Sequence, residues 1–145
     1  MQVIAMYTRM QTVWRTLVCA ILIAVPGSLI AAGDFTGDWH PYSGPVVWLG
    51  VMTVEPERLQ FDTGPSAQLE PVRENGSVFR IVGSEGNPYG ECGSGAQEYV
   101  AFRVLDNGLL ARLYYKVDIP PGDPTGTNAM EIVQNGACSV MFYSR

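Results

Sequence analysis

Three Asn-Gly pairs punctuate the second half of this chain, and they restrict its fold more than any other feature. The pairs are Asn75-Gly76, Asn107-Gly108 and Asn135-Gly136. Both central residues of a type I′ turn need a positive φ angle, which Asn and Gly tolerate better than other residues. An Asn-Gly pair between apolar stretches therefore predicts a β-hairpin. The chain is expected to consist of antiparallel strands joined by tight turns.

The residues on either side of the second pair alternate as strands do. Val100, Phe102 and Val104 alternate with Ala101 and Arg103 before the turn. After it, one set of alternate positions from 109 to 117 is wholly apolar, whereas the other set includes Arg112 and Lys116. This period of two predicts two strands, each with one buried face. Further strands are expected at about 35–39, 46–54, 59–61, 68–72, 78–82, 129–133 and 138–143. No segment after residue 33 combines a helical apolar period with capping residues, so no helix is expected.

Many short antiparallel strands predict an all-β fold, either a small meander barrel or a β-sandwich. The barrel is favoured because closure removes exposed sheet edges. The expected strand Val46–Val54 is apolar on both faces. It would be covered on both sides or cross the middle of a curved sheet, with Gly50 marking a bend. Alternatively, its outer face would form an exposed apolar binding patch.

The first 32 residues have the pattern of an export signal. Arg9 and Arg15 precede the uninterrupted apolar run 17–25, and the small residues that follow predict cleavage after Ala32. The alternative is a retained membrane anchor, but the uncharged stretch is short and contains Pro26. We therefore expect a single domain, residues 33–145, that is periplasmic or secreted and has no membrane span after cleavage.

Cys92 and Cys138 are the two cysteines that remain after cleavage. An oxidising compartment favours a disulfide between them, which would tie the glycine-rich segment 83–95 to the last strand. Closing a loop of this length stabilises the folded state by roughly 4 kcal/mol in the chain-entropy model. A metal site would need more Cys or His ligands, and His40 is the sole histidine, so neither a metal nor another cofactor is expected.

The charge of the predicted domain excludes some partners. The chain has 14 acidic and nine basic residues; Arg9 and Arg15 lie in the signal, so seven basic residues remain and the net charge is near −7. Nucleic acids and anionic membrane surfaces need clustered Lys and Arg, so neither is an expected partner. The chain also lacks the motifs of common hydrolases and nucleotide-binding enzymes, and a non-catalytic protein is expected.

The segment Phe35-Thr36-Gly37-Asp38-Trp39 resembles the Gly-x-Trp motif that opens the first strand of lipocalins and related calycin barrels. The resemblance implies that Gly37 and Trp39 are structural, with the Trp closing the base of the barrel. It also implies that a disulfide to the C-terminal region is common and that the opposite mouth admits an apolar ligand.

Two functions remain open from the sequence. The first is a binding protein that holds an apolar ligand or an exported protein partner, with a pocket or patch formed by Trp48, Met52, Tyr89 and Tyr115. The second is an inhibitor or immunity protein for an exported hydrolase. In that case acidic loops would enter a cationic cleft, and the contact residues would be Glu85, Glu91, Asp118 and Asp123. A filled barrel would favour the second function, and a ligand cavity the first.

Overall fold

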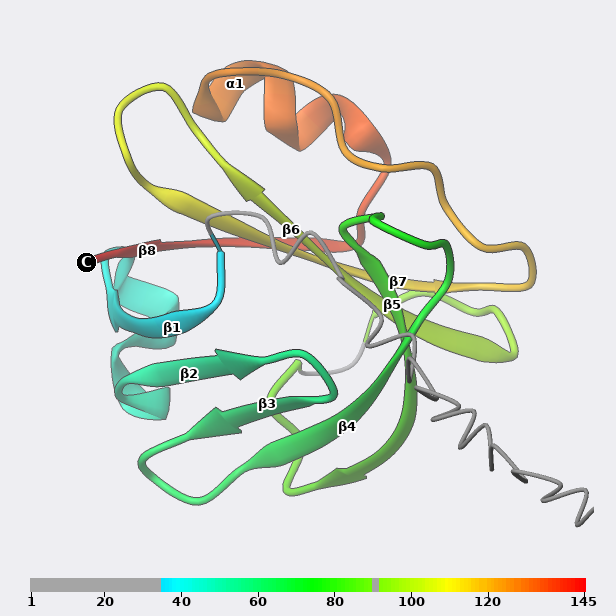
Figure 1. Ribbon diagram of the computed structural model, residues 1–145, viewed down its shortest axis with the longest axis horizontal. Coiled ribbons are helices and arrows are strands. Elements are labelled where there is room, and N and C mark those ends of the chain that lie inside the picture. The colour runs from blue at the N-terminus through cyan, green and yellow to red at the C-terminus, as the bar shows by residue number, and fades with distance from the viewer. Residues whose placement is uncertain (1–34, 90–91) are drawn as a thin grey trace, which may run out of the picture.

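The computed structural model describes residues 35–89 and 92–145. The predicted export signal and its cleavage site after Ala32 lie outside the described residues. Eight antiparallel strands follow one another in chain order and close into a barrel (Figure 1). They are β1 (Gly37–Pro41), β2 (Met52–Glu55), β3 (Arg58–Phe61), β4 (Ser66–Pro71), β5 (Val78–Glu85), β6 (Gln97–Val104), β7 (Leu110–Val117) and β8 (Ser139–Ser144).

The first and last strands form the seam of the barrel. His40 pairs with Ser144 and Pro41 pairs with Tyr143, so β1 and β8 are hydrogen-bonded neighbours. Every other strand pairs with the strands before and after it in sequence. The predicted meander barrel is therefore confirmed, and the sandwich alternative is wrong.

Two of the three Asn-Gly pairs lie in hairpin connections, as predicted. Gly108, with a φ of 81°, lies in the turn between β6 and β7, and its N–H donates to the Leu105 carbonyl at 2.9 Å. Asn75, with a φ of 57°, lies in the connection between β4 and β5. Both turns use positive φ at one residue of the pair. The hairpin prediction is confirmed, but the expected type I′ geometry is wrong for both turns, because it needs positive φ at two residues.

The third pair does not form a hairpin. Residues Ala129–Ile132 form a short helix, α1, followed by a 3₁₀ turn, η2 (Val133–Asn135), and Gly136 ends the turn with a φ of 75°. The Asn128 side chain accepts hydrogen bonds from the N–H groups of Met130 and Glu131, which caps α1. The predicted strand at 129–133 and the expectation of no helix are therefore wrong.

The apolar segment 46–54, predicted to be one strand, forms a strand only from residue 52 onward. Gly44–Leu49 form a 3₁₀ helix, η1, and β2 begins at Met52. Pro45 suits the start of a helix, and Gly50 ends it with a φ of 73°. With three residues per turn, Val46 and Leu49 both face the protein, whereas Val47 and Trp48 face outward. The predicted strand over residues 46–51 is wrong for this reason.

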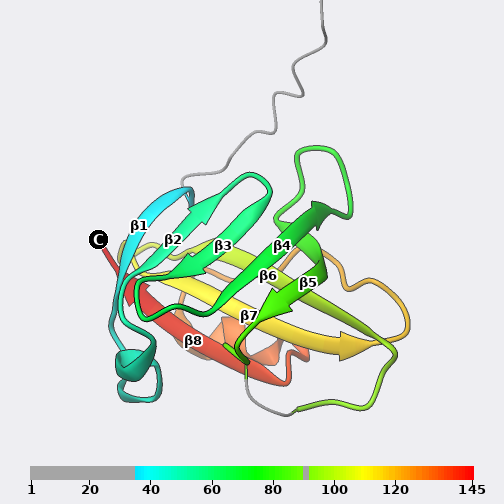
Figure 2. The same ribbon diagram turned by 90° about the horizontal axis from the view of Figure 1, so that it is seen from below.

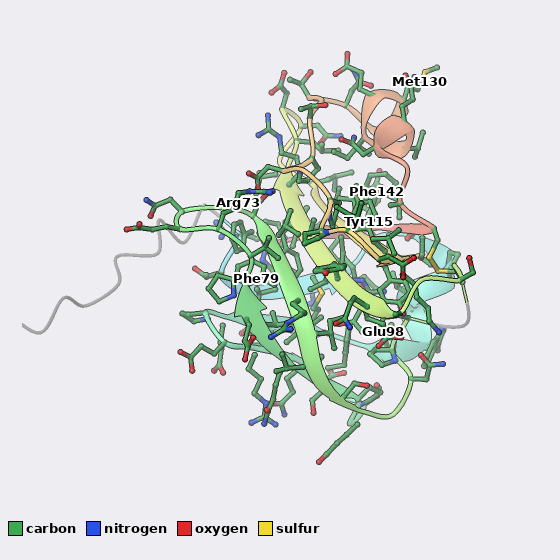
Figure 3. All side chains as sticks on the ribbon, turned by 90° about the vertical axis from the view of Figure 1, so that its right-hand side faces the viewer. Arg73, Phe79, Glu98, Tyr115, Met130 and Phe142 are labelled. Atoms are coloured by element: carbon green, nitrogen blue, oxygen red, sulfur yellow. A yellow bond between two sulfur atoms is a disulfide. The ribbon has the colours of Figure 1, made fainter. Side chains whose placement is uncertain are left out.

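The protein has two apolar layers, one inside the barrel and one outside it. The inner layer includes Trp39, Met52, Phe61, Phe79, Phe102, Leu110 and Tyr143. The outer layer lies where residues 118–137 fold back over the barrel wall and α1 covers it (Figure 1). It includes Ala101, Leu113, Tyr115 and Ile132. In Figure 3, Tyr115 and Phe142 lie on the α1 side of the sheet. Strands β6 and β7 are thus buried on both faces over much of their length, not on one as predicted.

The residues of the Gly-x-Trp motif lie at the start of β1. The Trp39 side chain is 1% exposed, and its indole N–H donates to the Phe35 carbonyl at 2.8 Å. The Arg145 guanidinium, from the end of the chain, lies 4.5 Å from the centre of the Trp39 ring system. Trp39 is therefore a packed structural residue. The eight-stranded barrel is compatible with the lipocalin-like architecture that the motif suggests.

Candidate functional site

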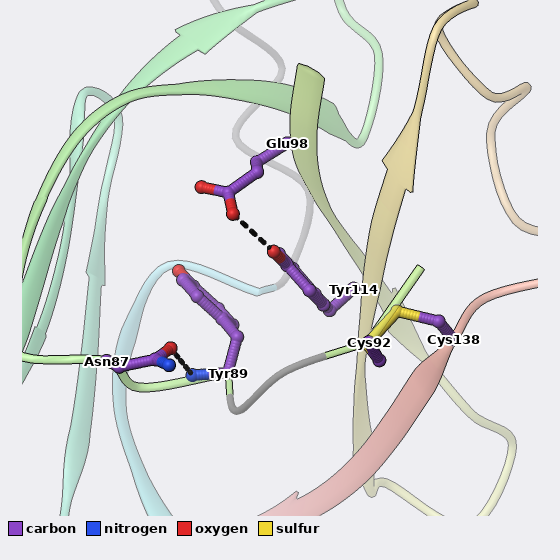
Figure 4. The surroundings of a disulfide bond; sticks show 6 residues. All are labelled: Asn87, Tyr89, Cys92, Glu98, Tyr114 and Cys138. Carbon is purple, nitrogen blue, oxygen red and sulfur yellow. Dashed lines mark hydrogen bonds between the residues drawn. A yellow bond between two sulfur atoms is a disulfide. The ribbon is translucent and has the colours of Figure 1, made fainter. Parts of the chain in front are cut away.

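The disulfide between Cys92 and Cys138 holds the β5–β6 connection against the start of β8 (Figure 4). The two Cα atoms are 5.7 Å apart, so the predicted pairing is confirmed. Further along the same connection, Gly95 N donates to the Lys116 carbonyl at 3.0 Å. Ala96 N donates to the Asp118 carboxylate at 2.8 Å. The connection is thereby fixed to β7 and to the segment that follows it.

Tyr89 lies in the β5–β6 connection, at the end of the barrel that we name the mouth. Its ring is 8% exposed and stacks on Tyr114 of β7, with ring centres 4.6 Å apart and an angle of 6° between the planes. The Asn87 side chain accepts a hydrogen bond from the Tyr89 N–H at 3.4 Å, within the same connection (Figure 4). Burial raises the pKa of the Tyr89 phenol despite the nearby positive charge of Arg112, so this phenol is neutral at physiological pH.

The two stacked tyrosines line part of a surface pocket of about 530 Å³. It is lined by Ser84, Gly86, Asn87, Tyr89, Cys92, Gly93, Glu98, Tyr114 and Lys116. The Tyr114 hydroxyl donates to Glu98 at 2.7 Å. Burial is the larger cause, and this hydrogen bond the next, of the raised pKa of the Tyr114 phenol. Glu98 and Lys116 are cross-strand neighbours on β6 and β7. The pocket is therefore polar, with an acid and a base side by side, and it suits a polar ligand better than an apolar one.

The second surface feature is η1, which lies beside β1 and β8 (Figure 2). Tyr42, Val47 and Trp48, which we name the apolar cap, are 64%, 63% and 61% exposed. Val46 and Leu49 anchor the helix in the core. The apolar cap thus presents three large apolar side chains to solvent within seven residues of sequence.

Hydrogen bonds on both sides hold the apolar cap in place. Tyr42 N and Ser43 N both donate to the Phe142 carbonyl of β8 at 3.0 and 3.3 Å. On the opposite side, the Thr63 hydroxyl donates to the Leu49 carbonyl at 2.7 Å. The helix is therefore fixed to β8 and to the β3–β4 connection, which limits the conformational entropy that its exposed side chains would lose on binding.

The structure does not bring the four predicted ligand residues together. Trp48 is exposed on η1, whereas Met52 is buried inside the barrel. Tyr89 lies at the mouth, and Tyr115 belongs to the outer layer beneath α1. Tyr89 is thus the member of this set that lines the mouth pocket, and a ligand-binding role for the four residues stays a prediction.

The predicted partner-contact carboxylates are also spread over the surface. Glu85 is exposed at the end of β5, and Glu91 lies outside the described residues. Asp118 accepts its bond from Ala96, whereas Asp123 accepts hydrogen bonds from Ser77 N and Oγ at 2.8 and 3.2 Å. Burial disfavours the ionised form of Asp123, but the bonds from Ser77 and the charge of Arg73 outweigh it and lower its pKa. Their contact role stays a prediction.

Comparison with protein-family models, with curated proteins and with solved structures found no match for this chain. In the part of the chain that the structure describes, no group of three or more His, Cys, Asp or Glu side chains is arranged to hold a metal ion. Within the same residues, none of the helices has the length and apolar character needed to cross a membrane.

Sequence reasoning missed Arg112, the most unusual residue near the mouth. Its side chain is 2% exposed and points into the barrel from β7, between Leu110 and Tyr114 of the inner layer. The guanidinium carbon lies 5.1 to 5.6 Å from the ring centres of Tyr89, Phe61 and Tyr143. The alternation in β7 marks Arg112 as a charge on a strand, but it does not show that this face is the interior.

Proposed function

We propose that this chain is a non-catalytic, exported binding protein that recognises a partner protein through the apolar cap. The observation that carries the proposal is the exposure of Trp48 beside Val47, on a helix fixed at both ends. Exposed tryptophans in well-ordered positions are typical hot spots of protein interfaces. Clustered apolar side chains on the surface of a small protein are a mark of an interaction site.

The packing of the barrel supports a protein partner over an apolar small ligand. Large side chains occupy the interior, among them Trp39, Phe61, Phe79, Phe102 and Tyr143, each at most 1% exposed. Carriers of apolar ligands enclose their ligand in an apolar cavity. The pocket at the mouth of this barrel is instead open and polar. The apolar cap offers three exposed apolar side chains on one fixed segment, whereas the other exposed large apolar residues are Val82, Ile119, Met130 and Val133.

The charge of the chain supports a basic partner. Residues 33–145 carry 14 acidic and seven basic side chains, and one of these seven, Arg112, is buried. Two further arginines pair with acids, Arg73 with Asp123 and Arg80 with Glu70. The resulting negative field would attract a partner with a basic face and speed its association.

The second candidate is an inhibitor or immunity protein for an exported hydrolase, and the filled interior supports it as well. This candidate places the contact on acidic loops instead of the apolar cap. Glu85 is exposed at the end of β5, as a contact residue in such a loop would be. The two candidates therefore differ in which surface the partner covers.

The test is position-specific photo-crosslinking followed by affinity measurement. The photoreactive residue p-benzoyl-phenylalanine replaces Trp48 in one variant, Glu85 in a second and Met130 in a third. Met130, which is 79% exposed on α1, is the matched apolar control. Crosslinking is carried out in an extract of the source cells, and the adduct is identified by mass spectrometry. We expect an adduct of one mass from position 48, and its yield should fall as the salt concentration is raised.

The purified partner then provides the decisive measurement by calorimetry. Trp48→Ala should weaken binding by about 2 kcal/mol, roughly thirtyfold in Kd, while Met130→Ala leaves it unchanged. An adduct from position 85 with none from position 48 would transfer the proposal to the inhibitor candidate. Equal adducts from positions 48 and 130, or full affinity in Trp48→Ala, would refute the role of the apolar cap.

A further inference from the structure

Arg112 carries a buried positive charge that no ion pair in the described residues neutralises. Its guanidinium makes one hydrogen bond, from Nη2 to the Pro88 carbonyl at 3.3 Å. Nε and Nη1 are buried and make no hydrogen bond. Arginine remains protonated in proteins, so burial cannot be relieved by loss of the proton. The aromatic faces of Phe61, Tyr89 and Tyr143 compensate part of the charge by cation–π attraction.

Two further unsatisfied groups belong to the same cluster. The hydroxyls of Tyr89 and Tyr143 are buried and lack hydrogen-bond partners, and both rings flank Arg112. Burial raises the pKa of both phenols against the opposing charge of Arg112, so both keep their protons and can donate. We name Arg112, Tyr89, Tyr143 and Phe61 the arginine cage. Among the described residues, four buried side-chain nitrogen or oxygen atoms have no hydrogen-bond partner, and all four belong to this cage.

Native proteins pair nearly all their buried polar groups, so four unpaired atoms in one cluster require an explanation. The nitrogen atoms are donors only, and the phenols can donate. A water molecule would accept hydrogen bonds here but would leave the positive charge in place. An anion would do both, because it accepts hydrogen bonds and neutralises the guanidinium.

We propose that the arginine cage binds a small monovalent anion, either a halide or a carboxylate of one or two carbons. The size limit follows from the packing, because three ring centres lie only 5.1 to 5.6 Å from the guanidinium carbon. The Tyr89 ring both lines the mouth pocket and lies against Arg112, so a single ring separates the cage from the solvent side. The proposal concerns different residues from the apolar cap and requires no partner protein.

The test measures thermal unfolding of the purified protein as chloride, formate or acetate replaces gluconate at constant ionic strength. Gluconate is monovalent but too large for the cage. We expect a saturable rise of the midpoint, about 5 °C at ten times the dissociation constant, with chloride or with the carboxylates. Which of the three salts gives the rise distinguishes a halide site from a carboxylate site. Equal midpoints in all four salts would overturn the proposal.

Three variants locate the effect. Arg112→Met should abolish the anion response, whereas Arg58→Met, which removes an exposed arginine of β3, should keep it. Tyr143→Phe keeps the ring and removes one hydroxyl, so it should raise the half-saturating anion concentration several-fold even if Arg112→Met does not fold. A response retained in Arg112→Met, lost in Arg58→Met or unchanged in Tyr143→Phe would overturn the proposal.

Discussion

Replacing both cysteines with alanine, Cys92→Ala with Cys138→Ala, should lower the free energy of unfolding by about 4 kcal/mol. The magnitude follows from the sequence separation of 46 residues, because the bond removes closure entropy for a loop of that length from the unfolded chain. Small domains are stable by about 5–15 kcal/mol in all, so this is a large share. For a domain of this size, the melting temperature should fall by roughly 15 °C.

Urea unfolding followed by tryptophan fluorescence measures the change, since Trp39 is buried and becomes exposed on unfolding. The midpoint should fall and the slope should rise, because the reduced unfolded chain exposes more surface. Adding a reductant should shift the wild-type curve onto that of the double variant and leave the double variant unchanged. If the free energy of unfolding fell by less than about 1 kcal/mol, the entropic argument would be refuted. The other contacts of the β5–β6 connection would then be what holds it in place.

Three further predictions concern backbone geometry and ionisation. Asn128→Ala should destabilise the protein by about 1 kcal/mol and speed amide exchange at the start of α1, because two N–H groups lose their cap. Gly95→Ala should cost about 1–3 kcal/mol, since a Cβ would lie 2.2 Å from the Val117 backbone, whereas Gly83→Ala has open space and should change stability little. Burial raises the pKa of Tyr115 from 10.0 to about 12, so the folded state holds this proton more tightly than the unfolded state does. The stability that this contributes should be fully present below pH 10 and lost as the pH rises from 10 to 12. Unfolding measured over this pH range should show that loss, and Tyr115→Phe should make it smaller.

The parts of the fold that could be predicted depend on local chemistry. The Asn107-Gly108 turn and the alternation on both sides of it predict a hairpin, and β6 and β7 pair there over eight residue pairs. The disulfide could be predicted because the domain has two cysteines. Barrel closure followed from the need to protect sheet edges, which applies to any meander of this size.

The helical segments left signals that strand-based reasoning passed over. A run as short as Val46–Leu49 fits a strand or a 3₁₀ helix equally well. A strand buries every second residue and a 3₁₀ helix every third, and four residues do not distinguish the two periods. Pro45 before the run and Gly50 after it were the boundary signals. In the same way, Asn128 followed by Glu131 matches the capping pattern at a helix start. Both segments are short, so tertiary packing decides their conformation.

The position of the candidate site could be predicted less well, because it depends on which surface each long connection covers. Trp48 is exposed since η1 turns its outer residues to solvent, whereas Tyr115 is buried since residues 118–137 fold back over β7. Proline and glycine in that connection mark an irregular segment but not the direction in which it runs. Contact residues inferred from chemistry alone therefore scatter over the surface, the inner layer and the outer layer of the protein.

Arg112 shows how this covering segment determines the chemistry of the interior. An alternating strand normally turns its charged positions to water and its apolar positions to the core. In β7 the wholly apolar set, with Ala111, Leu113 and Tyr115, packs beneath the 118–137 segment, so the set that contains Arg112 lines the barrel. If residues 118–137 left the outer face uncovered, β7 would be free to turn its wholly apolar face inward. Arg112 would then be exposed to solvent. The outer layer thus keeps inside the barrel a cation that has aromatic neighbours but no ion pair among the described residues, and the anion titration tests how the protein accommodates it.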